Sequence, residues 1–257
     1  MIKFFRHIRY NLMETGKTGK YFKYAIGEIV LVVIGILIAL SINNWNQSRI
    51  NNIEERDYYC KFLDDVRQDH EMLNEQREVA KLRLHHSNKL LQNLQNDNVD
   101  LADLANDMKL SVQSINANLE PTKTAFEDLK SSGSLKIIKD DVIKNKLSNY
   151  YSNAQGIMNV INDNYAAVGE RFKSNNDRLS TGWVYLIEDQ DGFDTTLVDV
   201  SKLKALSKFN ETIKTSMIND ALAYLGTNSR NLYHYNTLET AIKNIESALI
   251  IKCNTND

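Results

Sequence analysis

One apolar run near the start of the chain dominates the hydrophobic pattern. Residues 25–42 read AIGEIVLVVIGILIALSI, with Glu28 as the one charged residue. A helix rises about 1.5 Å per residue, so the run covers most of a hydrocarbon core of roughly 30 Å. The pattern predicts a transmembrane helix over residues 25–43. The rival interpretation is a cleaved signal peptide ending near Ser41, which the long basic leader before the run disfavours.

The charges on the two sides of this run differ. Residues 1–24 hold six lysine and arginine residues against Glu14 alone, whereas residues 43–47 are uncharged and rich in asparagine. Lysine and arginine concentrate on the cytoplasmic side of membrane helices. We therefore expect residues 1–24 to be a basic cytoplasmic leader lying on anionic membrane lipid. Residues 44–257 are then expected in the periplasm, with the anchor in a bacterial inner membrane.

Beyond the anchor, apolar residues recur with a helical period at both ends of the chain. The first series, within a helix expected from about residue 45 to 95, is Tyr59, Val66, Leu73, Ala80, Ser87 and Leu94, and the last is Tyr235, Leu238, Ile242, Ile245 and Leu249. A second row on the first helix is interrupted by His70 and Arg77. Such a mixed coiled-coil-like seam is typical of a bundle helix.

Residues that start and stop helices divide the middle of the chain. The expected helices cover about residues 100–118, 122–131 and 141–173, and a helix or helix pair covers about residues 201–225. Asp100 and either Asp140 or Asp141 are the expected N-caps, and Gly226 is the expected stop before the last helix. Residues 174–196 are the least helical. With one proline in the chain, the pattern predicts an all-α fold: one N-terminal transmembrane helix followed by an antiparallel helical bundle.

Two blocks of the sequence resemble a known family. The opening, MIKFFRHIRYNLMETGKTGKYFKYAIGEIVLVVIGILIALSINNWNQ, is similar to the N-terminus of an uncharacterised family of single-pass membrane proteins from Bacteroidota. In that family a "KYAIGEI" entry and an "INNWN" exit flank the apolar span. Residues 125–151, AFEDLKSSGSLKIIKDDVIKNKLSNYY, resemble its central "LKSSG…LI…YY" block. The resemblance implies a bacterial inner-membrane location and assigns no catalytic residue.

The central block also predicts a sharp corner between two helices. A glycine at the end of the first helix can adopt positive φ and return the chain. Two interpretations stay open: a structural corner with core tyrosines, or a ligand or partner site formed by Ser131, Ser132, Gly133, Tyr150 and Tyr151. The apolar residues expected to face the core here are Phe126, Leu129, Leu135, Ile137, Ile138 and Val142.

The two cysteines and the small residues of the apolar run suggest contacts between helices. If the last helix returns antiparallel to the first, Cys60 and Cys253 lie at similar positions along the bundle axis. An oxidising periplasm then permits a disulfide between them. Two free thiols are the other outcome. Gly35 and Ala39 form a small-xxx-small step where membrane helices approach closely. This step favours a homo-oligomer or a contact with a protein partner.

Candidate metal ligands are few. His85 and His86 are adjacent, so on a helix they point about 100° apart and do not readily share one ion. Asp65 and Asp69 stand four residues apart beside His70. This arrangement is either an ordinary polar face or a weak cation site.

The acidic loop at residues 188–194 has some resemblance to a calcium-binding loop. In an EF-hand register, Gly192 at the sixth position places Ile187 at the first position and Val198 at the twelfth, where carboxylates are required. The register therefore fails. The GxSxG, HExxH, P-loop and dinucleotide motifs do not occur in the sequence, so we predict no enzyme activity, cofactor or metal.

Charge and composition narrow the function further. With 31 basic and 33 acidic residues the net charge is −2, which argues against nucleic-acid binding. The preferred function is a non-enzymatic, membrane-anchored periplasmic interaction or scaffold subunit of an envelope assembly. The alternative is a periplasmic small-ligand sensor that signals through a partner protein. An enzyme with an unrecognised site around the acidic loop and Trp183 is a third class.

Overall fold

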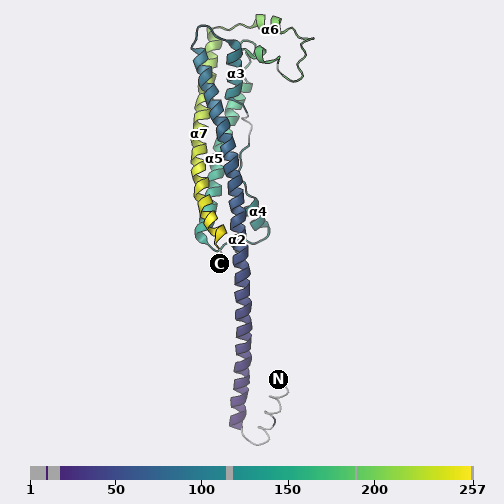
Figure 1. The fold of residues 1–257 in the computed structure, drawn as a ribbon, viewed down its shortest axis with the longest axis vertical. Helices are drawn as coiled ribbons and strands as arrows, with labels where there is room; N and C mark the ends of the chain where they lie inside the picture. Colours follow the sequence, from purple (N-terminus) through teal and green to yellow (C-terminus); the bar gives the residue numbers. More distant parts are fainter. Residues whose placement is uncertain (1–9, 11–17, 114–117, 189, 256–257) are drawn as a thin grey trace. The chain divides into compact units, whose positions relative to one another are not determined.

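The computed structural model describes residues 10, 18–113, 118–188 and 190–255, and these residues form helices and connecting turns with no strand (Figure 1). The elements are α2 (Thr18–Leu94), α3 (Leu101–Ser111), α4 (Thr124–Ser131), α5 (Asp141–Lys173), the 3-10 helix η1 (Trp183–Leu186), α6 (Val200–Leu206) and α7 (Glu211–Asn254). The chain divides into two compact units, Met1–Arg56 and Asp57–Asp257, and α2 contributes to both. The all-helical prediction is confirmed; the proposed domain boundaries stay predictions.

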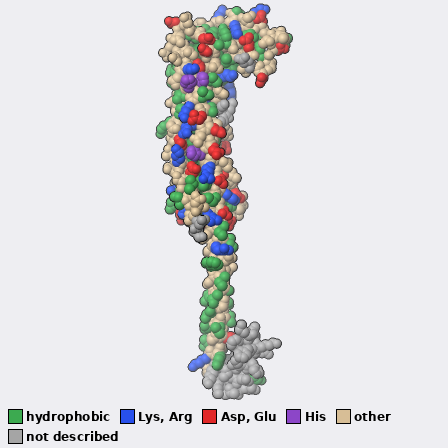
Figure 2. Space-filling model, in the orientation of Figure 1, with side chains coloured by type: hydrophobic (Ala, Val, Ile, Leu, Met, Phe, Trp, Pro, Cys, Tyr) green, Lys and Arg blue, Asp and Glu red, His purple; other side chains and the backbone are tan. Residues whose placement is uncertain are grey.

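The first unit exposes its apolar side chains. Across residues 25–42 of α2, each side chain is exposed or half-exposed, and none is buried by another part of the described chain. The space-filling view shows this hydrophobic surface (Figure 2). In length and composition α2 is the one helix of the described residues that can cross a membrane. Most of the basic leader, residues 1–9 and 11–17, lies outside the described residues.

The second unit buries its apolar side chains along two heptad series. All six members of the α2 series and all five of the α7 series are buried, which confirms both patterns. Their core also includes α5, and Figure 1 shows the three helices side by side. The polar residues that interrupt the α2 pattern meet partners on α7: His70 lies 3.4 Å from Glu246, and Arg77 pairs with Glu239.

Contacts between α2 and α7 follow one order along both helices. Cys60 and Cys253 form a disulfide, with an S–S distance of 2.00 Å and a Cα–Cα distance of 4.9 Å. Farther along α2, buried Ser87 accepts a hydrogen bond from Asn228 Nδ2 at 3.1 Å. Positions on α7 thus fall as positions on α2 rise.

Some helix boundaries differ from the sequence expectation. α2 has no end near residue 43, and α3 ends at Ser111 instead of continuing to about residue 118. Residues 114–117, part of that expected helix, lie outside the described residues. The expected stop at Gly226 is wrong, because α7 continues through it. A lone helical glycine costs about 1 kcal/mol, and the buried residues Tyr224 and Asn228 on either side keep this stretch against the core.

The expected N-caps are present. Asp100 accepts hydrogen bonds from the backbone amides of residues 102 and 103 at the start of α3, which confirms its role. At α5 the cap is Asp140 rather than Asp141, and its side chain accepts from the amides of Val142 and Ile143. This places Val142 on the outer side of the first turn, where it is 64% exposed. The expectation that Val142 faces the core is therefore wrong.

Candidate ligand-binding site

Two buried carboxylates of α2 fix the start of α4. Asp65 and Asp69 are 3% and 0% exposed. Asp65 Oδ2 accepts a hydrogen bond from the amide of Ala125, and Asp69 Oδ1 accepts one from the amide of Thr122, both at 2.7 Å. Lys123, at the N-cap position of α4, offers no capping side chain. The amides at the start of a helix need hydrogen-bond acceptors. Asp65 and Asp69 of α2 supply these acceptors from across the core, because the residues next to α4 do not.

One of these carboxylates, Asp69, also binds a tyrosine of α5. Tyr150 donates its hydroxyl hydrogen to Asp69 Oδ2 at 2.5 Å. Burial raises the pKa of Asp65 and Asp69 above the usual value, and these hydrogen bonds offset only part of that cost. Burial, together with the charge of Asp69, also raises the pKa of Tyr150. This cluster therefore connects α2, α4 and α5 and holds the corner rigid.

The turn after α4 satisfies its own polar groups. Gly133 has a φ of 72°, as expected for a left-handed stop. The hydroxyls of Ser131 and Ser132 each donate to a backbone carbonyl three residues earlier, at 3.1 and 3.2 Å. Ser132 also lies 3.4 Å from the hydroxyl of Tyr58 on α2. In this arrangement the serine hydroxyls form hydrogen bonds within the turn itself.

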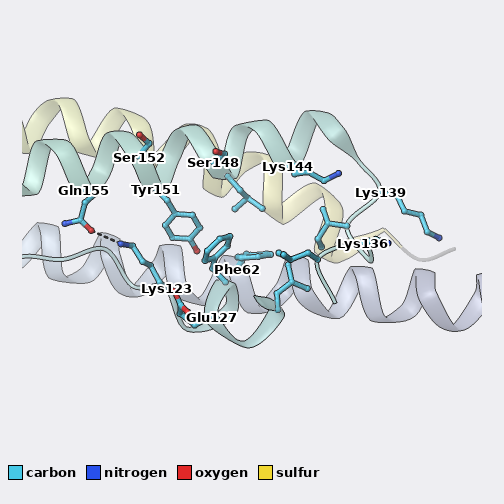
Figure 3. Close-up of a pocket in the computed structure, with 15 residues that line it drawn as sticks. Phe62, Lys123, Glu127, Lys136, Lys139, Lys144, Ser148, Tyr151, Ser152 and Gln155 are labelled. Carbon is cyan, nitrogen blue, oxygen red and sulfur yellow. Dashed lines mark hydrogen bonds between the residues drawn. The ribbon is translucent and has the colours of Figure 1, made fainter. Parts of the chain in front are cut away.

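A cavity of about 1040 Å³ opens beside the corner, between α2, α4, α5 and the connection from α4 to α5 (Figure 3). Its apolar lining consists of Phe62, Phe126, Leu129, Leu135, Ile138 and Leu147. Phe126 and Leu135 are 38% and 48% exposed, so the expectation that they face a closed core is wrong. Both are exposed because they line this cavity. Its volume is at the upper end of the range of small-molecule sites, about 300–1,000 Å³.

The two adjacent tyrosines of α5 face different surroundings. Tyr150 is turned to Asp69, whereas the ring of Tyr151 reaches into the cavity toward Phe62 (Figure 3). The ring centroids of Tyr151 and Phe62 are 6.5 Å apart, and those of Tyr151 and Phe126 are 5.9 Å apart. The Tyr151 hydroxyl is buried and has no hydrogen-bond partner among the described residues. Of the five corner residues predicted from the sequence, Tyr151 is the one that lines the cavity.

Positive charge surrounds the apolar lining. Among the described residues that line the cavity, four are lysines, Lys123, Lys136, Lys139 and Lys144, and one, Glu127, is acidic. Lys123 Nζ donates to Gln155 Oε1 at 2.7 Å and closes one end, while the other three lysines gather at the opposite end (Figure 3). The cavity is therefore apolar along its length and cationic at one end.

A second polar cluster lies deeper in the unit. Arg83 of α2 is fully buried, and its guanidinium carbon stacks 4.2 Å from the ring centre of Tyr165 on α5. The hydroxyl of Tyr165 lies 3.5 Å from that of Tyr235 on α7. Burial raises the pKa of Tyr235. Sequence reasoning missed this cluster, although Arg83 lies three residues after Ala80 and four before Ser87, on the buried seam.

The histidine pair does not act as a unit. His86 Nδ1 lies 2.7 Å from Asp107 Oδ1 of α3, whose other oxygen accepts a hydrogen bond from Asn93 Nδ2 at 3.0 Å. His85 is exposed. In the described part of the chain, no group of three or more histidine, cysteine or acidic residues is placed to hold a metal.

The acidic loop is held by ordinary polar contacts. Glu188 pairs with Lys204 of α6 at 3.0 Å, and Asp194 accepts a hydrogen bond from the amide of Thr196 at 2.8 Å. Hydrogen bonds from the hydroxyl and then the amide of Thr196 lower the pKa of Asp194. Residue 189 lies outside the described residues.

Fold and site together describe an all-helical protein with one long apolar N-terminal helix and a cavity at an internal corner. The chain belongs to a family of unknown function, DUF6090, which matches residues 28–166 and so covers more than half of its length. The match includes most of the apolar run, both buried carboxylates and all residues that line the cavity. No curated protein and no solved structure matches the chain.

Proposed function

We propose that the chain is a non-enzymatic, membrane-anchored binding protein that takes a small ligand in the corner cavity and passes its occupancy to a partner protein. The observation that carries this proposal is the cavity itself, about 1040 Å³ in volume, with an apolar lining and polar groups at its ends. Concave apolar sites with a few fixed polar groups are typical of ligand binding. We therefore propose the small-ligand sensor ahead of the scaffold subunit.

The anchor part of the proposal rests on exposure and charge. No other part of the described chain buries the apolar side chains of residues 25–42, and in water that arrangement is costly. The basic residues before the run and the asparagine-rich segment after it support a cytoplasmic N-terminus. A single pass through a bacterial inner membrane then leaves the second unit in the periplasm. The Cys60–Cys253 disulfide fits such an oxidising compartment.

The second unit is proposed to be an antiparallel helical bundle. Its support is the reverse order of the contacts between α2 and α7, from Cys60–Cys253 at one end to Ser87–Asn228 toward the other. A bundle of this kind forms ligand sites between its helices. Here the start of α4 is fixed to α2 by hydrogen bonds from the amides of Thr122 and Ala125 to Asp69 and Asp65, and the cavity lies beside it.

A direct test is to extract the full chain from its own membranes into polymer-bounded lipid discs and identify the bound small molecules by native mass spectrometry. Ser148→Trp places a large side chain in the cavity lining and should abolish the co-purified mass. Asn153→Trp, on an exposed face of α5 outside the lining, should keep it. Equal occupancy in both variants, or no ligand in the wild type under any lipid supply, would contradict the proposal.

The interaction or scaffold subunit remains the second candidate, and one observation favours it. Leu222 and Tyr233 are 51% and 68% exposed on α7, and eleven residues are about three turns, so both lie on one face. A partner protein or a second copy would cover this face. Photo-crosslinking from position 233 in intact cells should capture a specific partner. A chain that stays uncrosslinked there, with Gly35→Leu leaving the oligomeric state unchanged, would remove this candidate.

A further inference from the structure

The cationic end of the cavity restricts the chemistry of its ligand. Lys136, Lys139 and Lys144 are exposed side chains at the same end (Figure 3). Two acids are close in sequence, and each already has a partner: Asp140 pairs with Lys252 at 2.7 Å, and Asp141 pairs with Lys144 at 2.8 Å. With Lys252 and both acids counted, these described residues carry four positive charges and two negative ones. This end therefore favours an anionic group.

The rest of the cavity favours an extended apolar chain. On α5 the lining runs from Lys144 to Gln155, a distance of about 16 Å at about 1.5 Å per residue. Between these ends the lining is mainly aliphatic and aromatic. At the far end the bond between Lys123 and Gln155 closes the path. An elongated apolar space with one charged end matches a molecule with an apolar tail and an anionic head.

We propose that the ligand is a single-chain anionic amphiphile, with its carboxylate or phosphate at Lys136, Lys139 and Lys144 and its tail along Phe62, Phe126 and Tyr151. This inference rests on the proposed function and specifies its ligand class. Lysine is a point charge on a flexible stem, so it holds a carboxylate or a phosphate without the paired geometry that arginine requires.

The test uses ligands with one chain length and different heads. The full chain is placed in phosphatidylcholine nanodiscs and labelled with a diazirine-bearing fatty acid, and dodecanoate, dodecyl phosphate, dodecanol and dodecylammonium compete with the label. Empty nanodiscs correct for partition into lipid. Peptides carrying the label are mapped by mass spectrometry. We expect labelling within residues 123–155, and competition about tenfold stronger for both anions than for dodecanol, a factor equal to about 1.4 kcal/mol.

Charge variants sharpen the result. Replacing Lys136, Lys139 and Lys144 with glutamine should remove the preference for the anions, and added salt should weaken it in the wild type because exposed charges are screened. The matched control replaces three exposed lysines outside the lining, Lys89, Lys109 and Lys146, with glutamine and should leave the preference unchanged.

The outcomes separate this inference from the proposed function. If dodecanol competes as well as dodecanoate, and Ser148→Trp abolishes labelling, the cavity binds a ligand but the anionic class is wrong. If phosphatidylglycerol in the nanodisc displaces the label, the single-chain assignment is wrong. If no labelling maps to the cavity, both proposals fail.

Discussion

The two sides of α5 present opposite kinds of surface. Toward α7 it packs through Ala154, Met158, Ile161 and Tyr165, which are at most 1% exposed. Toward α4 it presents Tyr151 and the residues around it to an open cavity. One helix therefore joins a close-packed interface to a hollow one. On the hollow side the start of α4 is fixed to α2 by hydrogen bonds to Asp65 and Asp69, whereas burial of apolar surface stabilises the packed side.

Because of this difference, we expect stability and ligand binding to depend on different residues of the unit. Residues on the packed side are expected to matter for folding, because a cavity created there costs free energy. On the hollow side, Phe126 and Leu135 are already partly exposed, so their replacement is expected to change binding with little change in stability. The predictions below test that separation.

The largest effect is expected from truncation on the packed side. Ile242 of α7 is fully buried, and Ile242→Ala should lower the free energy of unfolding by about 2–5 kcal/mol. Leu135→Ala, in the cavity lining, should stay within about 0.5 kcal/mol. Denaturant unfolding of the full chain in nanodiscs, followed by circular dichroism, gives both values. Equal losses in the two variants would contradict the separation.

Next in size is the disulfide, which holds the end of α7 to α2. The bond joins residues 193 positions apart, and cross-links of native proteins typically contribute about 2–4 kcal/mol. Reductant should therefore lower the unfolding midpoint of the wild type. The Cys60→Ser, Cys253→Ser double variant should unfold at that lower midpoint with or without reductant. Free thiols at both positions in native membranes would show that the bond does not form.

Asp69 tests whether polar bonds hold the hollow side open. Asp69→Ala leaves the Thr122 amide and the Tyr150 hydroxyl without their acceptor, at a cost of about 1–3 kcal/mol for each buried group left unpaired. Asp64→Ala, an exposed neighbour on α2, is the control and should change stability by less than about 0.5 kcal/mol. If Asp69→Ala leaves the free energy of unfolding unchanged, the corner is stable without these hydrogen bonds.

The smallest effect is expected in the pH dependence of stability. Asp65 has a raised pKa in the folded state, so the folded chain holds that proton more tightly than the unfolded chain. The wild type should gain stability relative to Asp65→Asn as the pH falls through the raised value toward the ordinary one.

Asp140 is the control with the opposite sign. Its hydrogen bond to Lys252 lowers the pKa, so the stability that Asp140 contributes is present above the ordinary pKa and is lost as the pH falls through the lowered one. Unfolding curves at several pH values measure both differences. The same sign for Asp65→Asn and Asp140→Asn would contradict the assignment.

Periodicity and capping predicted much of the second unit. The heptads of α2 and α7, the caps Asp100 and Asp140, and the left-handed Gly133 all follow from local rules that the structure obeys. These features depend on residues close in sequence, so the sequence alone was enough. Gly226 is the exception, because packing against the rest of the core outweighs a local preference.

The second buried row of α2 was not predictable from hydrophobicity. It lies three residues after each of the first five members of the first row and contains the buried Phe62, Asp69, Arg83 and Leu90 and the half-buried Gln76. Three of these residues are polar. A search for apolar residues therefore selects a different row as buried, the one that lies four residues after the first row. Asp69 and Arg83 are nevertheless fully buried: Asp69 binds the amide of Thr122, just before α4, and the Arg83 guanidinium stacks on Tyr165 of α5. Such partners are distant in sequence.

The cavity could not be predicted from the sequence for a related reason. Phe126 and Leu135 have the composition of core residues, and their exposure depends on where α4 is held. That position is set by Asp65 and Asp69, sixty and fifty-three residues away from the amides they bind. The sequence indicated the corner and Tyr151, but not the space beside them.

Hydrogen–deuterium exchange of the full chain in nanodiscs, with and without dodecanoate, tests the central claim most directly. The account predicts slower exchange within residues 123–152, around the cavity, and unchanged exchange within residues 235–249 on the packed side of α7. Slowing of both regions to the same extent, or of neither, would contradict it.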